Sequence, residues 1–477
     1  MTRHLPAPGF TICAFLLASA SVHAQDPIRT GTVAQTYEQL CASCHGLKLQ
    51  GGSAPSMLDD VWAHGGDDES LARSIHTGYP EKGMPAWSPA LSSEQIRALV
   101  IYIREQRAHA LRENTTFATP KDDVTVSSQL HRYRLQTWVD GITEPWSLTF
   151  LPGGHALATE KRGNLLLIEK GAHNRKVIRG TPPVDYDNQA GLFDVVLHPQ
   201  YAKNGWIYLA FSDPQKNADG RTVSLTRIIR GRLKGGALVD QETVYQAPLP
   251  VYPRAGGVHF GGRIAFDHAG FLYFTIGERG RAPNAQDVTV PIGKVHRLHD
   301  DGRVPADNPL VGDKTAVPSI WSCGHRNPQG LAFDPVSGDL YDAEHGPRGG
   351  DEINFIQPGL NYGWPVITHG MNYDGTPVTD LTAKDGMEQP VTYWVPSIAV
   401  CGINFYTGNL FPKWKNHLFV ASLAAEELRR LELRDRKVVA QEVIFKNVGR
   451  IRHVIGGPDG ALYVLLPERI ARMTPAD

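Results

Sequence analysis

Short apolar segments separated by turn residues recur along the chain from residue 146 onward. Each segment reads as one apolar strand, a turn that contains Gly, Pro or Asp, and a second apolar strand. Six copies are present, and they begin at Trp146, Asp194, Gly262, Gly330, Gly402 and Ile451. They return at intervals of roughly 45 to 70 residues, which is typical of four-stranded propeller blades. We therefore predict an all-β six-bladed propeller over residues 131–477, because a two-sheet sandwich would not explain the similarity of the copies.

The N-terminal part of the chain has a helical pattern instead. Ile96, Leu99, Val100 and Ile103 recur at helical spacing after the helix-start signal Ser92-Ser93-Glu94. We predict an N-terminal all-α domain over residues 25–110. Residues 111–130 are polar and lack sustained periodicity, so they are interpreted as a linker between the two domains.

Residues 1–24 have the pattern of a secretory signal peptide. Arg3 and His4 precede the apolar run ICAFLLASASV, and Val22-His23-Ala24 places small residues where a signal peptidase cuts. We expect a cleaved leader, a mature chain that starts near Gln25 and a periplasmic location. No stretch approaches the length of apolar sequence that spans a bilayer, so we expect no stable membrane insertion.

Length and charge narrow the class of protein. A chain of 477 residues is too long for one ordinary compact core, which agrees with two domains. The net charge of −1 and the pI near 7.0 provide no basic field for nucleic acid and no polybasic membrane patch. We therefore expect no nucleic-acid partner.

Cys41-Ala42-Ser43-Cys44-His45 is the C-x-x-C-H pattern of covalent c-type haem attachment. On one helical turn the two thiols of Cys41 and Cys44 can reach the two haem vinyl groups, and His45 can face the iron. A redox dithiol is the alternative, but it does not explain the following histidine or the export signal. The sequence therefore predicts a covalent haem c.

Met84, in Lys82-Gly83-Met84-Pro85-Ala86-Trp87, is the candidate for the second axial ligand of the iron. His64 and His76 are alternatives. The loop and the helix after it resemble the small class I cytochrome c pattern, and the resemblance covers residues 30–110.

Polar residues of the predicted propeller cluster where the repeats begin or end. In a propeller, such positions face one end of the central channel and converge there. A histidine base with a carboxylate to orient it, together with arginines that clamp carboxylates, suits an anionic cofactor and a proton abstraction. The candidates are His259 and Glu278 for catalysis, and Gln189, Arg326, Asn327, Arg450 and Arg452 for the cofactor.

The stretch from Glu344 to Asn354 is rich in oxygen donors and turn residues. Hard cations prefer carboxylate and carbonyl oxygens, so the composition indicates a Ca²⁺ loop rather than a zinc site.

Residues 137–475 resemble the soluble quinoprotein glucose/sorbosone dehydrogenase family, and most closely its periplasmic aldose sugar dehydrogenases. The resemblance is carried by QAGLFDVVLHP, HFGGRIAFD, IWSCGHRNPQG, EHGPRGGDEIN, NYGWP and GRIRHV. It implies a six-bladed propeller that binds pyrroloquinoline quinone (PQQ) and Ca²⁺ on its axis. The family's histidine removes the proton from the anomeric hydroxyl while a hydride passes to the quinone.

The resemblance also assigns roles to residues. It implies His259 as the base, Glu278 as its supporting acid, and Tyr373 as a further PQQ ligand beside those named above. Gly346 and Pro347 would offer carbonyls to the Ca²⁺ at the cofactor, and Glu352 and Tyr362 resemble a second Ca²⁺ site. The family has a lysine where this chain has Ala424.

We therefore expect an enzyme that oxidises aldoses to lactones and passes electrons from PQQ to its haem. The final acceptor would be external, such as a soluble cytochrome or a respiratory-chain component. A non-catalytic sugar-binding propeller and a Ca²⁺-dependent lactonase remain alternatives. We expect long loops such as Met371 to Met387 to set the sugar specificity, and Cys323 and Cys401 to stay unpaired.

Overall fold

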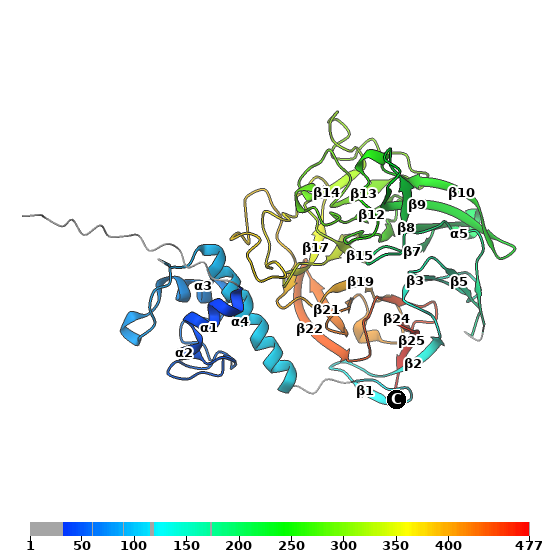
Figure 1. Cartoon of the computed structure of the whole chain (residues 1–477). Helices are drawn as coiled ribbons and strands as arrows, with labels where there is room; N and C mark the ends of the chain where they lie inside the picture. The colour runs from blue at the N-terminus through cyan, green and yellow to red at the C-terminus, as the bar shows by residue number, and fades with distance from the viewer. Residues whose placement is uncertain (1–31, 60, 89, 115–118, 172–173, 477) are drawn as a thin grey trace, which may run out of the picture.

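The computed structural model of the protein describes residues 32–59, 61–88, 90–114, 119–171 and 174–476. These residues form a small helical domain and a ring of six β-sheets (Figure 1). The six-bladed propeller and the helical N-terminal domain predicted from the sequence are therefore confirmed. The predicted signal peptide lies outside the described residues.

The N-terminal domain contains four helices around one apolar core. Helix α1 begins at a capping box, in which Gln35 N donates to Thr32 Oγ1 and Thr32 N donates to Gln35 Oε1. Helix α3 is capped by Asp67, whose carboxylate accepts from Ser70 N at 2.8 Å. The elements are α1 (Val33–Leu40), α2 (Ala42–His45), α3 (Asp68–Thr77), η1 (Pro80–Lys82) and α4 (Ser93–Asn114).

Each sequence repeat forms the first two strands of one blade. In five blades the strands follow one another as a four-stranded antiparallel sheet. Blades 1 to 3 comprise β3 (Pro145–Phe150), β4 (Ala156–Glu160), β5 (Leu165–Ile168) and β6 (Arg175–Val177); β7 (Leu192–Leu197), β8 (Trp206–Lys216), β9 (Thr222–Lys234) and β10 (Ala237–Tyr245); and β11 (Ile264–Phe266), β12 (Leu272–Ile276), β13 (Lys294–Leu298) and β14 (Ile320–Cys323). Blades 4 and 5 comprise β15 (Pro328–Phe333), β16 (Leu340–Glu344), β17 (Asp351–Ile356) and β18 (Thr392–Trp394); and β19 (Val400–Phe405), β20 (Leu418–Ser422), β21 (Glu427–Arg434) and β22 (Lys437–Lys446). Short helices α5 (Tyr201–Asn204), η2 (Leu249–Val251), η3 (Ala282–Ala285) and η4 (Pro412–Trp414) lie in the connections.

Blade 6 is built from both ends of the propeller sequence. It comprises β23 (His453–Gly456), β24 (Leu462–Leu466) and β25 (Arg469–Pro475), with β2 (Arg132–Asp140) as its fourth strand and β1 (Thr125–Ser127) beyond it. Strand β2 pairs with β25, so that Leu135 lies opposite Met473. The Tyr133 hydroxyl donates to the carbonyl of Ile444 in β22 at 2.9 Å, which ties this strand to blade 5 as well. The ring is thereby closed by hydrogen bonds, as a propeller requires.

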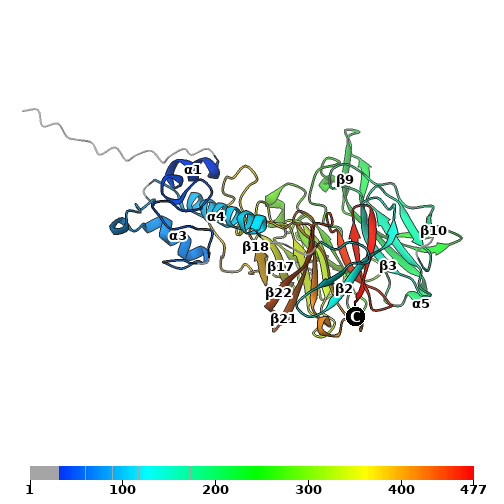
Figure 2. The same ribbon diagram turned by 90° about the horizontal axis from the view of Figure 1, so that it is seen from below.

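The apolar cores of the propeller lie between neighbouring blades. Six buried clusters occupy the six interfaces, and the first strands of adjacent blades contact one another all the way around the ring. A seventh cluster fills the helical domain and includes Met371 and Val395 from blade 4. The helical domain lies beside blade 4, with α4 next to the propeller (Figure 2).

The predicted linker, residues 111–130, carries regular structure at both ends. Helix α4 continues to Asn114, and β1 begins at Thr125. Tertiary pairing of β1 with β2 organises a segment that has no periodic pattern of its own. Among the described residues, no helix is long and apolar enough to cross a membrane.

Ring closure predicts where the propeller is sensitive to substitution. Leu135 in β2 is 1% exposed, and replacing it by Ala removes apolar contacts from the closing strand. We expect Leu135→Ala to lower the free energy of unfolding of the propeller by about 2 to 5 kcal/mol in guanidinium titrations. Arg132→Ala, at an exposed position of the same strand, is the matched control and should change it by less than about 0.5 kcal/mol. Equal effects of the two substitutions would contradict this role of β2.

Candidate cofactor and catalytic site

The candidate site lies where the first strands of the blades begin and their second strands end. Gln189 precedes β7, His259 precedes β11 and Asn327 directly precedes β15. Glu278 follows β12, and the Glu278 N–H donates to the carbonyl of Arg326 at 2.9 Å. Residues from blades 2, 3 and 4 therefore meet here, since His259 N donates to Gln189 Oε1 and Gly261 N donates to Asn327 Oδ1.

His259 is held on three sides. Its backbone is left-handed, with φ of 59°, which is uncommon for a residue other than glycine. Its N–H donates to Gln189 Oε1 at 2.8 Å, and its ring Nδ1 contacts Glu278 Oε1. A Cβ on Gly277 would lie 2.4 Å from the His259 carbonyl oxygen, so only glycine permits this approach. Because Nδ1 interacts with Glu278, the other ring nitrogen of His259, Nε2, is the one that can contact a ligand.

Arg279 fixes the chain on both sides of the histidine, and sequence reasoning missed it. Its guanidinium donates to the carbonyl of Gly256 at 2.7 Å and to that of Val258, and lies 3.5 Å from the ring centroid of Phe260. The only sequence signal was its position directly after Glu278. Arg279 is therefore a positioning residue for the loop that carries His259.

The electrostatic surroundings keep His259 neutral. Burial lowers the pKa of His259, the hydrogen bond to Glu278 raises it, and the Arg326 charge lowers it. A neutral imidazole near pH 7 can accept a proton, which is the requirement for a general base.

Arginines surround a second histidine, His345, beside this site. The pKa of His345 is held well below its usual range by burial and then by the charges of Arg326, Arg452, His259 and Arg450. Among the described residues, none of the three arginines forms an ion pair with a carboxylate. Such a concentration of cations without counter-charge favours a polyanionic ligand. Sequence reasoning had not selected His345, although it directly precedes the predicted Gly346.

The Arg326 guanidinium bridges to the predicted calcium loop. It donates to the carbonyl of His345 at 3.1 Å and to that of Gly346 at 2.7 Å. A small cavity beside it is lined by Arg326, His345, Gly346, Gly350 and Thr368. A larger hollow at Asp334, Asp339 and Arg436 involves the turns β15–β16 and β21–β22, and it contains none of the predicted site residues.

Two further positions named from the sequence lie in connections. Tyr373 is 72% exposed in a turn of the β17–β18 connection. Ala424, where the family has lysine, lies just after β20, at the strand end that corresponds to Glu278 after β12. It provides no positive charge there.

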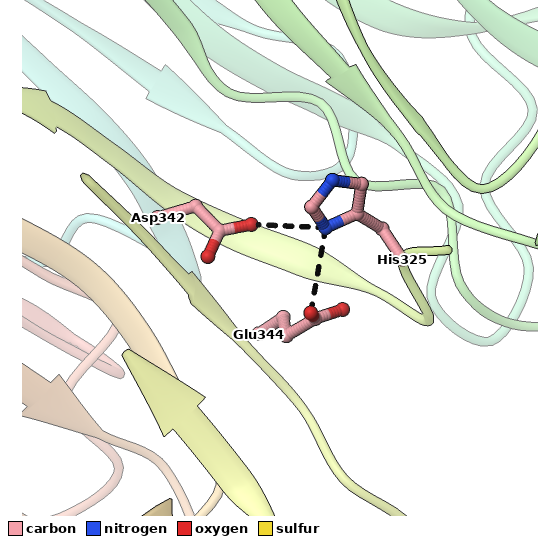
Figure 3. A group of neighbouring side chains, drawn as sticks. All are labelled: His325, Asp342 and Glu344. Carbon is pink, nitrogen blue, oxygen red and sulfur yellow. Dashed lines mark hydrogen bonds and ion pairs between the residues drawn. The ribbon is translucent and has the colours of Figure 1, made fainter. Parts of the chain in front are cut away.

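Buried carboxylates lie beside the small cavity, which Glu344 and Glu352 line. His325 Nδ1 is 3.4 Å from Asp342 Oδ2 and 3.4 Å from Glu344 Oε1 (Figure 3). Apart from this His325 contact, no hydrogen-bond donor of the described residues reaches the carboxylate oxygens of Asp342, although the residue is 0% exposed. The pKa of Asp342 is raised well above its usual range by burial and by the charge of Glu344. Unsolvated carboxylates of this kind are costly unless a cation neutralises them.

The predicted second Ca²⁺ site belongs to this cluster, with a different set of donors. Burial and the charge of Glu344 also raise the pKa of Glu352. The Tyr362 hydroxyl is already used, since it donates to the Phe355 carbonyl at 2.5 Å and accepts from Gln357 N at 2.8 Å. Asp342 is the oxygen donor that sequence reasoning missed, because it precedes the predicted Ca²⁺ stretch and lies in β16. Strand pairing puts Asp342 opposite Asn354 and Glu344 opposite Glu352.

The helical domain brings its predicted haem residues to one core. Cys41, Ala42 and Met84 pack against the same apolar cluster, and both thiols are free. Burial lowers the pKa of His45, which favours the neutral imidazole that a metal requires. These features fit a covalent haem between His45 and Met84.

The alternative ligands are placed less favourably. His64 stacks on Tyr79 with ring centroids 3.7 Å apart, and His76 is exposed on α3. In the propeller, Cys323 and Cys401 are free, and Cys401 Sγ instead lies 3.5 Å from Arg452.

Comparisons with known proteins assign families to both parts of the chain. Residues 142–474 match the family described as glucose / sorbosone dehydrogenase. Residues 29–103 match the family described as cytochrome C oxidase, cbb3-type, subunit III. The N-terminal domain is therefore a cytochrome c domain.

Similar proteins cover the whole propeller. The aldose sugar dehydrogenase YliI of Escherichia coli is 41% identical over 335 residues, which are 69% of this chain and 88% of that protein. The apo crystal structure of the soluble E. coli aldose sugar dehydrogenase covers 72% of this chain and 100% of its own, with a TM-score of 0.67 and 37% identity. The PQQ-bound aldose sugar dehydrogenase of Streptomyces coelicolor covers 72% and 98%, with a TM-score of 0.58 and 26% identity.

The contact between His259 and Glu278 predicts that the pKa of His259 depends on the Glu278 charge. Glu278→Gln keeps the shape of the side chain but removes the charge that raises the pKa of His259. We expect the pKa of His259 to fall further in an NMR titration of the histidine ring. Asp287→Asn, which removes an exposed carboxylate elsewhere in blade 3, should leave it unchanged. A rise, or no change, in the Glu278→Gln variant would contradict the arrangement.

Proposed function

This chain belongs to the glucose/sorbosone dehydrogenase family, and from this premise we propose that it oxidises the C1 hydroxyl of aldose sugars to lactones. PQQ would be the hydride acceptor, and the haem of the chain would carry the electrons onward. The observation that supports this proposal most is the fixed His259, whose Nδ1 contacts Glu278, close to Arg326 and to His345, the histidine on which Arg450 and Arg452 also act. Such a site can bind a polycarboxylate cofactor and take a proton from a sugar.

The arginines account for cofactor binding. Arg326, Arg450 and Arg452 can pair with the carboxylates of PQQ, and the amides of Gln189 and Asn327 face the same region through their hydrogen bonds to His259 N and Gly261 N. PQQ, when bound, supplies a quinone that accepts a hydride. Gly346, whose carbonyl already meets Arg326, would offer an oxygen to the accompanying Ca²⁺.

The proton is handled by the histidine. His259 Nε2 can accept the proton of the anomeric hydroxyl while Glu278 holds Nδ1 and stabilises the charge that forms on the ring. Arg279 keeps the loop in place during this change of charge. Ca²⁺ at Asp342, Glu344 and Glu352 would neutralise the buried carboxylates and stabilise blade 4.

Export and electron transfer complete the proposal. Haem attachment outside the cytoplasm agrees with the signal peptide predicted over residues 1–24, and the enzyme would act in the periplasm. An external one-electron carrier, such as a soluble cytochrome or a respiratory-chain component, would reoxidise the haem.

The direct test is reconstitution of the purified apoprotein with PQQ and Ca²⁺. We expect aldose-dependent reduction of an artificial dye, lactone as the product, and loss of turnover when Ca²⁺ is chelated. Sugar binding without dye reduction would favour the non-catalytic alternative. Lactone hydrolysis without any need for PQQ would favour a lactonase.

The assignment of the base predicts a kinetic result. We expect His259→Ala to lower kcat by at least about 10²-fold while PQQ remains bound, because the proton acceptor is lost. His268→Ala, at the exposed turn of the same hairpin, should retain wild-type turnover. PQQ binding is measured by absorbance in both variants. Near wild-type kcat in His259→Ala would remove this residue from the mechanism.

The haem ligands predict a spectroscopic result. We expect Met84→Ala to change the visible spectrum of the reduced haem and to lower its reduction potential, because a thioether ligand favours the ferrous state. Met57→Ala, which alters the same apolar core, is the control and should keep the spectrum. An unchanged spectrum and potential in Met84→Ala would assign the sixth ligand to His64 or His76.

A further inference from the structure

Part of the connection between β17 and β18 packs against the cytochrome domain. Met371, at the start of the segment Met371 to Met387, is 0% exposed and belongs to the apolar core of the cytochrome domain, together with Ile101 of α4. A Cβ on Gly375, in the same connection, would lie 3.1 Å from Val33 Cγ1 of α1.

An ion pair reinforces this contact. Arg348 Nε lies 2.9 Å from Glu105 Oε1, and its second nitrogen lies 2.7 Å from Glu105 Oε2. The two side chains are 30% and 7% exposed, so the pair is largely shielded from water. A bidentate guanidinium–carboxylate pair fixes orientation as well as distance. The ion pair and the apolar contact therefore fix the position of the cytochrome domain on blade 4.

A second polar contact lies beside the ion pair. Arg97 of α4 donates to Asp68 at 2.9 Å and to the carbonyl of His369 at 3.4 Å. The ring of His369 stacks on Tyr393 with centroids 3.7 Å apart and planes at 6°. The cytochrome domain thus binds two separate stretches of blade 4.

The docked stretches also form a wall of the small cavity. Gly346, Gly350, Ile367 and Thr368 line the cavity that contains Arg326 and His345. On the side of the turn that faces α4, Gly349 lies close to Ile101. A Cβ added at Gly349 would be 3.7 Å from Ile101 Cγ2. Arg348 and Met371 hold the two stretches together through reciprocal backbone hydrogen bonds of 2.9 and 3.0 Å. One layer of chain therefore separates the cavity from α4.

We propose that the Gly346–Gly350 turn and the β17–β18 connection form a docking site that holds the cytochrome domain on blade 4, on the far side of the turn whose Gly346 carbonyl meets Arg326. This inference rests on the proposed function. Each sugar oxidised would release two electrons, which would leave in two single transfers that reduce the ferric haem iron. An external one-electron acceptor takes each electron from the iron, and the protons go to solvent. The fixed contact makes both transfers intramolecular.

The test uses the holoenzyme with three readouts. Glu105→Arg places like charges at the ion pair, and Glu105→Arg combined with Arg348→Glu restores an opposite pair. Glu69→Arg, on the exposed face of α3, is the matched control. Glu105→Gln, which keeps the side-chain shape, covers the case in which Glu105→Arg fails to incorporate haem. The readouts are dye reduction, the rate at which sugar reduces the haem in stopped flow, and hydrogen exchange at the amides of Arg348 and Met371.

We expect haem reduction in the wild type at a rate independent of protein concentration. Glu105→Arg should slow it by at least about 10-fold and speed exchange at both amides, with dye reduction unchanged, and the double variant should recover. Wild-type haem reduction and wild-type exchange in Glu105→Arg would overturn the docking site. Absence of dye reduction in every protein would instead overturn the proposed function, and hydrogen exchange would still decide whether the domain is docked.

Discussion

The pairing of β2 with β25 is the constraint on which the rest of the structure depends. It joins the two ends of the propeller sequence in one blade and leaves each blade packed between two neighbours. Only in a closed ring do the first strands of all blades face a common axis. The convergence of Gln189, His259 and Arg326 follows from closure, because no short-range structure brings these residues together.

Closure gathers charges that the protein alone does not balance. Arg326 lines the small cavity together with Glu344 and Glu352, and the pKa values of Glu352 and of the neighbouring Asp342 are raised. An ion pair between the guanidinium and a carboxylate would satisfy both, yet Arg326 donates to the Gly346 and His345 carbonyls instead. This arrangement is expected if the arginine binds an anionic ligand and the carboxylates bind a cation. An anionic cofactor and a cation would then complete the blade.

Sequence patterns predicted the parts of this arrangement that depend on local chemistry. The sequence repeats predicted the blades, because hairpin periodicity and turn residues are encoded within each copy. The ends of the predicted strands indicated His259 and Glu278 as site candidates for the same reason. The roles of His345 and Asp342 depend on contacts between strands and blades, which leave no spacing signal in the chain. The contact of Met371 with the core of the cytochrome domain likewise depends on packing between two domains, and no sequence pattern indicates it.

The contact of the β17–β18 connection with the cytochrome domain determines how the two domains are oriented. A flexible linker alone would keep the haem near the propeller at a high effective concentration, in many orientations. The pairing of Glu105 with Arg348 selects one orientation, and it does so on the turn whose neighbour Gly346 meets Arg326. Because Cys44 is exposed while α4 faces the propeller, a haem attached at Cys44 would remain within reach of an external acceptor.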